Sequence, residues 1–307
     1  MNEEKTRTAF VVATKDRPRE LRRLVQSLEA QTRFPDEVIV VDGGRESVGA
    51  FCRAIRAFPV QHIRSLPPSA SRQRNRGVEA AHREAEFIGF LDDDIVLDEW
   101  AVEEMLRFWR GADARVGGAA FNLLNHPAVA WPLVKLSPFA EAAGFYSRRP
   151  GTVTPAGFQT MVGRPWSTVY TDWLPSTASL WRRDVFDRFR FDEWFEGYSY
   201  LEDLDFSYRV GKAYRLAVVA DAGYFHFPAT AGRGDGYEFG RREVLNRLHF
   251  VLKNPELSPA KCYLALAARL LMNLGLTLRE RNSHYLRRAY GNAVGLAVSF
   301  GRVGSSI

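Results

Sequence analysis

The sequence predicts an α/β fold in which a mixed, mainly parallel sheet is flanked by helices. Short runs of β-branched and aromatic residues alternate with segments whose apolar residues recur at helical spacing, which indicates strand–helix–strand units. Polar side chains follow several of these runs, at the strand ends where parallel sheets bind ligands. The chain has 307 residues, of which 46% are hydrophobic and 25% charged, so it can form one large domain with an appendage.

The first strand is expected over Thr8–Thr14, whose letters TAFVVAT form a buried β-branched run. Asp16-Arg17-Pro18 then begins a helix, because proline is tolerated in the first helical turn. Apolar residues at positions 21, 24, 25 and 28 give that helix one apolar face. The second strand, Glu37–Val41, ends at Asp42 and two glycines.

The following residues continue the alternation. We expect a helix over Val48–Phe58, a short strand over Val60–Ile63, an arginine-rich helix over Ser69–Arg83 and a strand over Phe87–Leu91. Because the carboxyl ends of parallel strands meet at one edge of a sheet, residues 14, 42 and 92 should lie on the same rim.

Three consecutive carboxylates, Asp92, Asp93 and Asp94, end the fourth of these strands. Burial of like charges is costly unless a cation or hydrogen-bond donors compensate them. Hard divalent cations such as Mg2+ and Mn2+ prefer oxygen ligands and accept phosphate oxygens as well. The cluster is therefore a candidate site for a metal and a diphosphate. A solvated acidic turn, or a cap for the next helix, is the alternative that this motif alone leaves open.

A second acidic group, Glu202 and Asp203, falls in the first turn of a helix expected within the segment YLEDLDFSYRV. The helix dipole and free amide groups favour an ionised carboxylate there, as a general base requires. Capping and solvent exposure are the structural alternative for the pair. His226 follows a later strand, and neutral imidazole is a ligand for borderline cations.

The middle of the chain has less regular patterning. Residues 121–175 are rich in Pro, Trp and Gly, so we expect loops and short strands there. Regular structure returns at Leu180–Arg183 and Phe195–Tyr214, and a short strand is expected over Arg215–Ala220.

Residues 251–307 form a basic C-terminal helical extension. Eight basic and two acidic residues lie there and account for the net charge of +6, so residues 1–250 are electrically balanced. This balance argues against a nucleic-acid partner for the body and points to an anionic surface that meets the tail.

Two helices are expected in this extension. Tyr263–Leu278 is apolar nearly all round, so we expect it to be buried or to form a homodimer face. Tyr285–Phe300 carries an apolar stripe at Leu286, Ala289, Tyr290, Ala293, Ala297 and Phe300. Either helix can contact a membrane peripherally, and simple packing on the body is the alternative.

Targeting signals are not evident in the sequence. The first ten residues, MNEEKTRTAF, lack the apolar region of a signal peptide, and no uninterrupted apolar stretch of spanning length occurs. Cys52 and Cys262 are far apart and have no metal-binding spacing, which suits a reducing compartment. We expect a cytoplasmic protein, with peripheral contact at the inner face of the cell membrane as an open expectation.

Six motifs stand in the order found in the family 2 glycosyltransferases, which the chain resembles over residues 7–250. They are FVVATKDRPRELRRLVQSLEAQT, VIVVDGG, SRQRNRGVEAA with its Arg-Asn-x-Gly, FIGFLDDDIVL, YLEDLDFSYRV with its Glu-Asp pair, and FHF. The resemblance implies a GT-A fold over residues 1–250, with a nucleotide-binding half at 1–120 and an acceptor and catalytic half at 121–250. It also implies inverting transfer of a hexosyl or deoxyhexosyl group from a sugar nucleotide.

The resemblance further implies roles on the nucleotide side. Thr14 and Asp42 would contact the nucleobase and its surroundings, with Arg17 near them. Arg74 would meet the base or the diphosphate, and Asp92 would hold the ribose.

For the metal and the chemistry, the resemblance implies a further set of residues. Asp94 and His226 would bind Mn2+ or Mg2+, although Asp93 could replace Asp94. Asp203 would be the general base with Glu202 beside it. Arg233, in a glycine-rich loop, could close over the diphosphate.

The implied partners are a UDP-, dTDP- or GDP-linked sugar and a saccharide or lipid-linked acceptor, in the synthesis of a cell-surface polysaccharide or glycolipid. A nucleotidyltransferase is disfavoured because the first strand is followed by Thr-Lys-Asp-Arg-Pro without a glycine. The same feature disfavours a dinucleotide-binding dehydrogenase. A binding or scaffold protein without turnover is the non-enzymatic alternative.

Overall fold

The chain forms two compact units in the computed structural model, which describes residues 7–126, 138–197, 199–228 and 235–303. The first unit comprises residues 1–128 and 162–229, and the second comprises residues 129–161 and 230–307. The boundary expected at residue 250 therefore falls inside a helix of the second unit, Gly236–Lys253.

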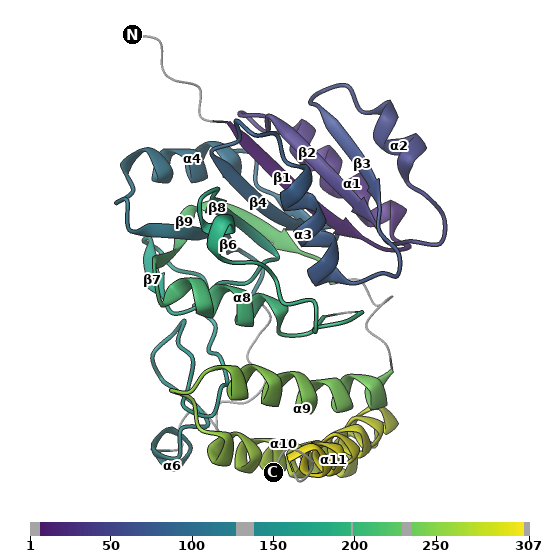
Figure 1. Cartoon of the computed structure of the whole chain (residues 1–307), viewed down its shortest axis with the longest axis vertical. Coiled ribbons are helices and arrows are strands. Elements are labelled where there is room, and N and C mark those ends of the chain that lie inside the picture. The colour runs from purple at the N-terminus through teal and green to yellow at the C-terminus, as the bar shows by residue number, and fades with distance from the viewer. Residues whose placement is uncertain (1–6, 127–137, 198, 229–234, 304–307) are drawn as a thin grey trace. The chain divides into compact units, whose positions relative to one another are not determined.

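A nine-stranded sheet, counted over the described residues, is the centre of the first unit (Figure 1). Its order is β3-β2-β1-β4-β8-β6-β9-β5, and β7 pairs with β9. The strands are β1 (Thr8–Thr14), β2 (Glu37–Asp42), β3 (Val60–Arg64), β4 (Phe87–Asp92), β5 (Ile95–Leu97), β6 (Val116–Leu123), β7 (Val169–Thr171), β8 (Ala178–Arg182) and β9 (Arg215–His226).

The sheet is mixed, with a parallel half and an antiparallel insertion. Strands β3, β2, β1 and β4 are parallel neighbours, whereas β8 runs antiparallel to both β4 and β6. Thr14 pairs with Asp42, and Ala13 pairs with Asp92. The polar residues that end β1, β2 and β4 therefore share one rim, as the sequence predicted.

Helices cover both faces of this sheet. The first unit contains α1 (Pro18–Glu29), α2 (Gly49–Ala54), α3 (Ala70–Ala80), α4 (Ala101–Gly111), α7 (Val185–Arg188) and α8 (Glu202–Gly211). Alternate residues of β1 face opposite layers: Phe10 and Val12 pack in the core that includes α1 and α4, and Ala9 and Val11 pack in the core that includes α3 and α8.

Helix α2 and strand β9 differ clearly in length from the sequence-based expectation. Helix α2 ends at Ala54 instead of Phe58, and the chain is already extended at Ile55. Phe58 precedes a proline, which disfavours a helical conformation there. Strand β9 continues past Ala220 to His226 because it leaves its first register with β6 and then pairs with β5. This extension brings His226 to the end of the strand.

The second unit is helical over most of its described residues, with α6 (Pro138–Ala142), α9 (Gly236–Lys253), α10 (Pro259–Glu280) and α11 (Ser283–Val303). The expectation that Tyr263–Leu278 is buried is wrong, because Leu264, Leu271 and Leu278 are exposed on α10. The expected apolar stripe of α11 is also largely exposed: Ala289 is buried, whereas Leu286, Tyr290, Ala293 and Ala297 are exposed, and the side chain of Phe300 lies outside the described residues. The other buried positions of α11 are Gly291, Asn292, Gly295 and Ser299.

Candidate active site

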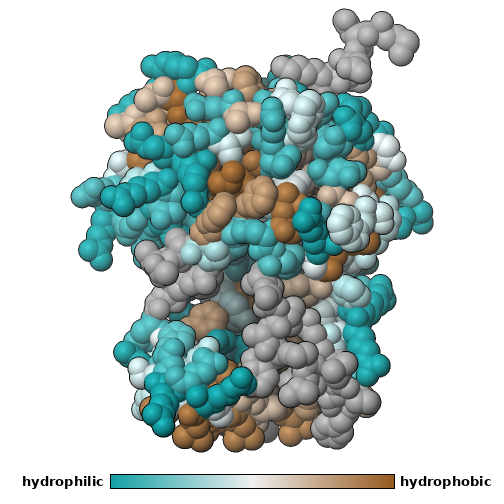
Figure 2. Space-filling view, turned by 180° about the vertical axis from the view of Figure 1, so that it is seen from behind, coloured by the Kyte–Doolittle hydropathy of each residue, from teal (hydrophilic) through white to brown (hydrophobic). Residues whose placement is uncertain are grey.

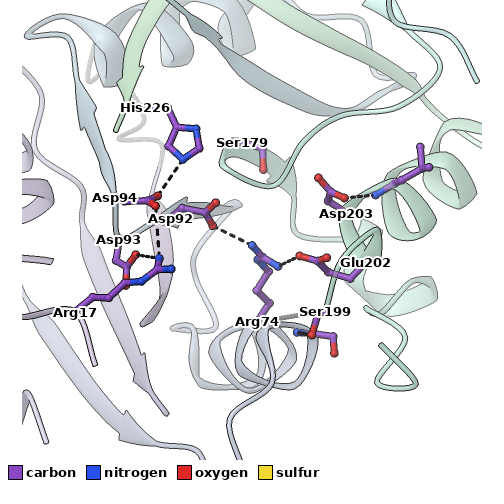
Figure 3. A network of polar contacts seen from close by, with 12 residues as sticks. Arg17, Arg74, Asp92, Asp93, Asp94, Ser179, Ser199, Glu202, Asp203 and His226 are labelled. Atoms are coloured by element: carbon purple, nitrogen blue, oxygen red, sulfur yellow. Dashed lines mark hydrogen bonds and ion pairs between the residues drawn. The ribbon is translucent and has the colours of Figure 1, made fainter. Parts of the chain in front are cut away.

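Charged side chains from five segments of the chain gather at the rim of the sheet (Figure 3). Asp92 ends β4, and Asp93 and Asp94 follow it directly. The other members are Arg17 before α1, Arg74 on α3, Glu202 and Asp203 at the start of α8, and His226 at the end of β9. Residues that are far apart in the sequence therefore form one polar site within the first unit.

Arg74 connects the two acidic groups of the site. Its Nη2 donates to Asp92 Oδ1 at 3.0 Å, and its Nη1 donates to Glu202 Oε1 at 2.5 Å. The guanidinium also lies over the ring of Phe191, 5.5 Å from its centroid. Arg74 is buried, which would lower its pKa, but the attraction of Glu202 and Asp92 outweighs burial and raises it. The side chain therefore stays charged and acts as a bridge.

The sequence around Arg74 explains how α3 presents it. Asn75 exchanges two hydrogen bonds with the backbone of Phe191, at 2.9 and 3.0 Å, and so attaches α3 to the segment before α8. Gly77 faces β1, where an added Cβ would lie 2.1 Å from Val11 Cγ1. Only glycine allows α3 to approach the sheet this closely. In the Arg-Asn-x-Gly motif, Arg74 thus bridges two carboxylates, Asn75 binds the backbone of Phe191, and Gly77 allows α3 to pack closely on β1.

Asp93 and Asp94 point to different partners. Asp93 accepts from Thr14 Oγ1 at 2.8 Å and from Arg17 Nη1 at 3.0 Å. Asp94 Oδ1 lies 3.1 Å from His226 Nε2, and its Oδ2 is 3.5 Å from Arg17 Nη1. Burial raises the pKa of Asp93 to about 7, against the attraction of Arg17. Of the two, Asp94 is the carboxylate that shares its surroundings with the histidine.

Asp42 builds the loop that follows β2. Its carboxylate accepts from the amides of Gly44 and Val48 at 2.8 and 3.0 Å, and from Arg64 Nη1 at 2.6 Å. Burial would raise the pKa of Asp42, but these donors together with His62 hold it below its ordinary value. The adjoining loop after β1 is attached through Asp16 Oδ1, which accepts from the amide of Arg45 at 2.6 Å. Asp42 therefore shapes this part of the rim as an ionised group.

The two carboxylates at the start of α8 differ in their surroundings. Glu202 is buried against Arg74, whereas Asp203 is partly exposed and its Oδ1 accepts from the amide of Leu204 at 2.7 Å. Burial raises the pKa of both groups. Among the described residues, Asp203 Oδ2 accepts no hydrogen bond. Asp203 is therefore the carboxylate of the pair that can accept a proton from an incoming molecule.

A turn in an unusual conformation precedes these carboxylates. Ser199 and Leu201 have φ angles of 52° and 77°, a backbone region that residues other than glycine rarely adopt. Ser71 Oγ and Ser199 Oγ both donate to the carbonyl of Phe195, at 2.8 and 2.6 Å. Ser71 is at the start of α3, so the helix that carries Arg74 also supports the turn that presents Asp203.

These supporting residues were missed by sequence reasoning. Ser69, Ser71 and Ser199 are small polar residues of a common type, and only the fold brings them together. Gln73 was missed in the same way, although its Nε2 ties the carbonyls of Thr14 and Val41 together at 3.0 and 2.7 Å. The sequence feature that could have indicated these residues is the high density of polar residues over Ser69–Asn75. Most of these side chains are buried in and beside α3.

The charge of the site favours a cation. Five carboxylates face two guanidinium groups, and burial raises the pKa of Asp92 as well as of the groups described above. The described residues contain no group of three or more His, Cys, Asp and Glu side chains that could hold a metal ion. The carboxylate–imidazole pair of Asp94 and His226 therefore fits a cation only as a partial set of ligands, which phosphate oxygens would complete.

Arg233, the other residue expected at the diphosphate, lies outside the described residues.

Comparison with known proteins identifies the family. The family described as glycosyl transferase family 2 matches residues 9–164, about half of the chain. The chain belongs to this family. The matched range includes Arg17, Arg74 and the three aspartates, and Glu202, Asp203 and His226 follow it. A search among curated proteins finds no match.

Solved structures with this fold include TarS of S. aureus. The chain superposes on one TarS structure with a TM-score of 0.51 at 19% identity, covering 88% of this chain and 44% of that one. TarS 1–349 in complex with UDP gives a TM-score of 0.50 at 18% identity, and its complex with UDP-GlcNAc gives 0.51 at 16%; each covers 90% of this chain and 74% of the other. At this identity the likeness shows the fold alone, which is of GT-A type.

Proposed function

We propose that the protein is a metal-dependent inverting glycosyltransferase that moves a sugar from a nucleoside-diphosphate sugar to an acceptor hydroxyl. The observation that carries this proposal is the bridge through Arg74, which joins Asp92 at the end of β4 to Glu202 at the start of α8, next to Asp203. A donor held on the rim and an acceptor activated at α8 would meet beside it. Family membership supports the same reaction type.

The nucleotide would lie over the loops after β1 and β2. We assign the surroundings of the base to Thr14, Arg17 and the loop that Asp42 organises. Asp92 would contact the ribose, and Arg74 the diphosphate. The TarS complexes contain UDP and UDP-GlcNAc, so a UDP-linked donor is the first to test, with dTDP and GDP donors as alternatives.

Asp203 would act as the general base. Its Oδ1 is held by the amide of Leu204, which leaves Oδ2 for the acceptor hydroxyl. Removal of the hydroxyl proton lets the oxygen attack the anomeric carbon as the bond to the diphosphate breaks, and a single displacement inverts that carbon. Glu202 would keep Arg74 in place beside it.

Asp94 and His226 are the residues that would hold Mn2+ or Mg2+, with Asp93 retained by Arg17 and Thr14 instead. A bound divalent cation would neutralise charge on the departing nucleoside diphosphate. The imidazole ligand favours Mn2+ over Mg2+.

The acceptor would be a saccharide or a lipid-linked intermediate at the cytoplasmic side of a membrane, in the synthesis of a surface polysaccharide or glycolipid. A protein that binds without turnover is the competing candidate, and it predicts no metal-dependent binding of any nucleotide.

Titration calorimetry of UDP, GDP and dTDP, each with Mn2+ and with EDTA, tests the proposal. We expect one nucleotide to bind at least tenfold more tightly with Mn2+. Equal binding of that nucleotide with EDTA would overturn the metal assignment. Absence of binding by all three under both conditions would overturn the proposed donor class.

A further inference from the structure

The outer face of α10 is an exposed apolar surface, which takes no part in the core of the second unit. It consists of the exposed residues Leu264, Ala267, Ala268, Leu271, Leu274, Gly275 and Leu278. Leu271 is 66% exposed and Leu278 is 82% exposed. These positions recur at helical spacing over about 21 Å, and no charged or polar residue interrupts them. Figure 2 shows apolar side chains along the lower edge of the molecule, where α10 and α11 lie in Figure 1.

The inner side of the same helices carries buried polar contacts as well as buried apolar residues. Asn273 Nδ2 donates to Asn292 Oδ1 at 2.8 Å between α10 and α11, and both residues are buried. Glu243 of α9 is buried and binds Arg269 and Arg288 at 3.1 and 2.8 Å. These polar contacts lie beside buried apolar residues such as Leu266 and Leu276. The outer leucines of α10 are therefore additional to the apolar core of the unit, and they remain exposed.

Close contacts between helix backbones complete this arrangement. A Cβ added at Gly291 would lie 2.1 Å from the carbonyl of Tyr237, and one added at Gly240 would lie 2.2 Å from the carbonyl of Arg288. Helices that associate within lipid pack through such small residues and through side-chain amides, because apolar side chains gain nothing from leaving lipid for a protein interior. The packing of α9, α10 and α11 includes contacts of this type.

Positive charge lies at both ends of the outer face. Lys261 precedes it, and Arg279 and Arg281 follow it. Arg279 and Arg281 are exposed and form no ion pair within the part of the chain that the structure describes. Basic side chains that flank an apolar helix face reach lipid phosphates while the face itself enters the acyl region.

We propose that the outer face of α10 docks on a bilayer that contains anionic lipids, with the helix lying in the membrane surface. Helix α10 is long and apolar enough to cross a membrane. On its inner side, however, Asn273 binds Asn292 and Arg269 binds Glu243. That polar side favours an orientation parallel to the surface.

A second copy of the chain is a less favourable occupant. A dimer formed through this face would bring the basic ends of two outer faces together, with Glu280 as the acidic residue beside them. Anionic lipid offers opposite charge at both ends and an apolar layer between them. The proposal does not depend on the reaction carried out by the first unit.

Flotation of the full chain with vesicles tests the proposal, using phosphatidylcholine alone and phosphatidylcholine with 30% phosphatidylglycerol. We expect the wild type to float with the anionic vesicles, and L271Q/L274Q to reduce the bound fraction at least tenfold. R279Q/R281Q should reduce binding to anionic vesicles to the level seen with phosphatidylcholine. The matched controls in the first unit are Leu66→Gln, an exposed leucine, and R83Q/R110Q, which removes the same charge; both should bind as wild type.

A second measurement reports on the face itself. Cys52 and Cys262 are buried, so Leu271→Cys supplies the accessible thiol for an environment-sensitive dye such as NBD. Its emission should rise with anionic vesicles, whereas the dye on Leu66→Cys should not respond. Wild-type binding by L271Q/L274Q, or an unresponsive dye at residue 271, would overturn the proposal. It would also be overturned if the wild type sedimented as a lipid-free dimer that these substitutions converted to a monomer.

Discussion

Arg74 and Glu202 form a buried ion pair, with 2.5 Å between Nη1 and Oε1, that joins the middle of α3 to the start of α8. The same guanidinium holds Asp92. The donor side and the acceptor side of the proposed reaction therefore share one cation. Movement or loss of this side chain affects both sides at once.

Replacement of Arg74 tests this relationship. Arg74→Ala leaves Glu202 buried without its partner, so we expect the free energy of unfolding to fall by about 3 kcal/mol or more. Arg74→Lys keeps the charge but cannot bridge two carboxylates, and we expect turnover to fall by roughly 100-fold. Chemical denaturation and steady-state kinetics measure the two effects. Arg76→Ala, an exposed neighbour on α3, should change neither, and an active R74K enzyme would contradict the bridging role.

The two aspartates after β4 should respond differently to substitution. Asp94→Asn weakens the pair with His226, so we expect Mn2+-dependent nucleotide binding to weaken at least tenfold. Asp93→Asn keeps oxygen and amide groups beside Arg17 and Thr14, and it should retain the Mn2+ dependence. Calorimetry on both variants measures this difference. The reverse ranking would transfer the metal-binding role to Asp93.

The activity should fall at low pH through protonation of Asp203. Burial raises the pKa of this group above its ordinary value of 3.8, and the positive charge of Arg74 opposes the rise. The base must be ionised, so the rate is lost as the pH falls through the raised pKa. Arg74→Gln removes the opposing charge, and the acidic limb of the kcat/KM profile should move to higher pH. An unchanged acidic limb of the kcat/KM profile in this variant would show that Arg74 does not influence the pKa of the base.

Stability of the second unit should depend on Glu243. Burial would raise the pKa of Glu243, but Arg269 and Arg288 hold it below the ordinary value of 4.5. The folded pKa is depressed, so the stabilisation is present above about pH 4.5 and is lost as the pH falls through the folded value. Glu243→Gln should lower the free energy of unfolding by about 3 kcal/mol at pH 7. Urea denaturation measures this loss, and Glu280→Gln, an exposed matched control, should show none.

The rim of the site was predictable because parallel strands align their ends. Thr14, Asp42 and Asp92 follow apolar runs, and their pairing follows from strand direction. The different contacts of Asp93 and Asp94 were not predictable, since they depend on where Arg17 and His226 lie. The contacts of Ser69 and Ser71 with the carbonyl of Phe195 are equally hidden, because each spans more than 120 residues of sequence.

The faces of α10 and α11 could not be assigned from periodicity. The usual inference assumes that the more apolar side of a helix faces inward. In this chain α11 buries glycine and asparagine against α9, and α10 exposes Leu264, Leu271, Leu274 and Leu278 while it buries Leu266 and Leu276. The sequence pattern locates the helices but not the surroundings of each face.

The most direct test of the account compares Asp203→Asn with Glu202→Gln and the wild type. The measurement is release of UDP from UDP-GlcNAc, or from the donor whose nucleotide binds in calorimetry, together with nucleotide affinity in Mn2+. We predict that Asp203→Asn binds the nucleotide like the wild type but releases product at least 100-fold more slowly, because the proton acceptor is lost. Turnover by Asp203→Asn at the wild-type rate would contradict the assignment of Asp203 as the base.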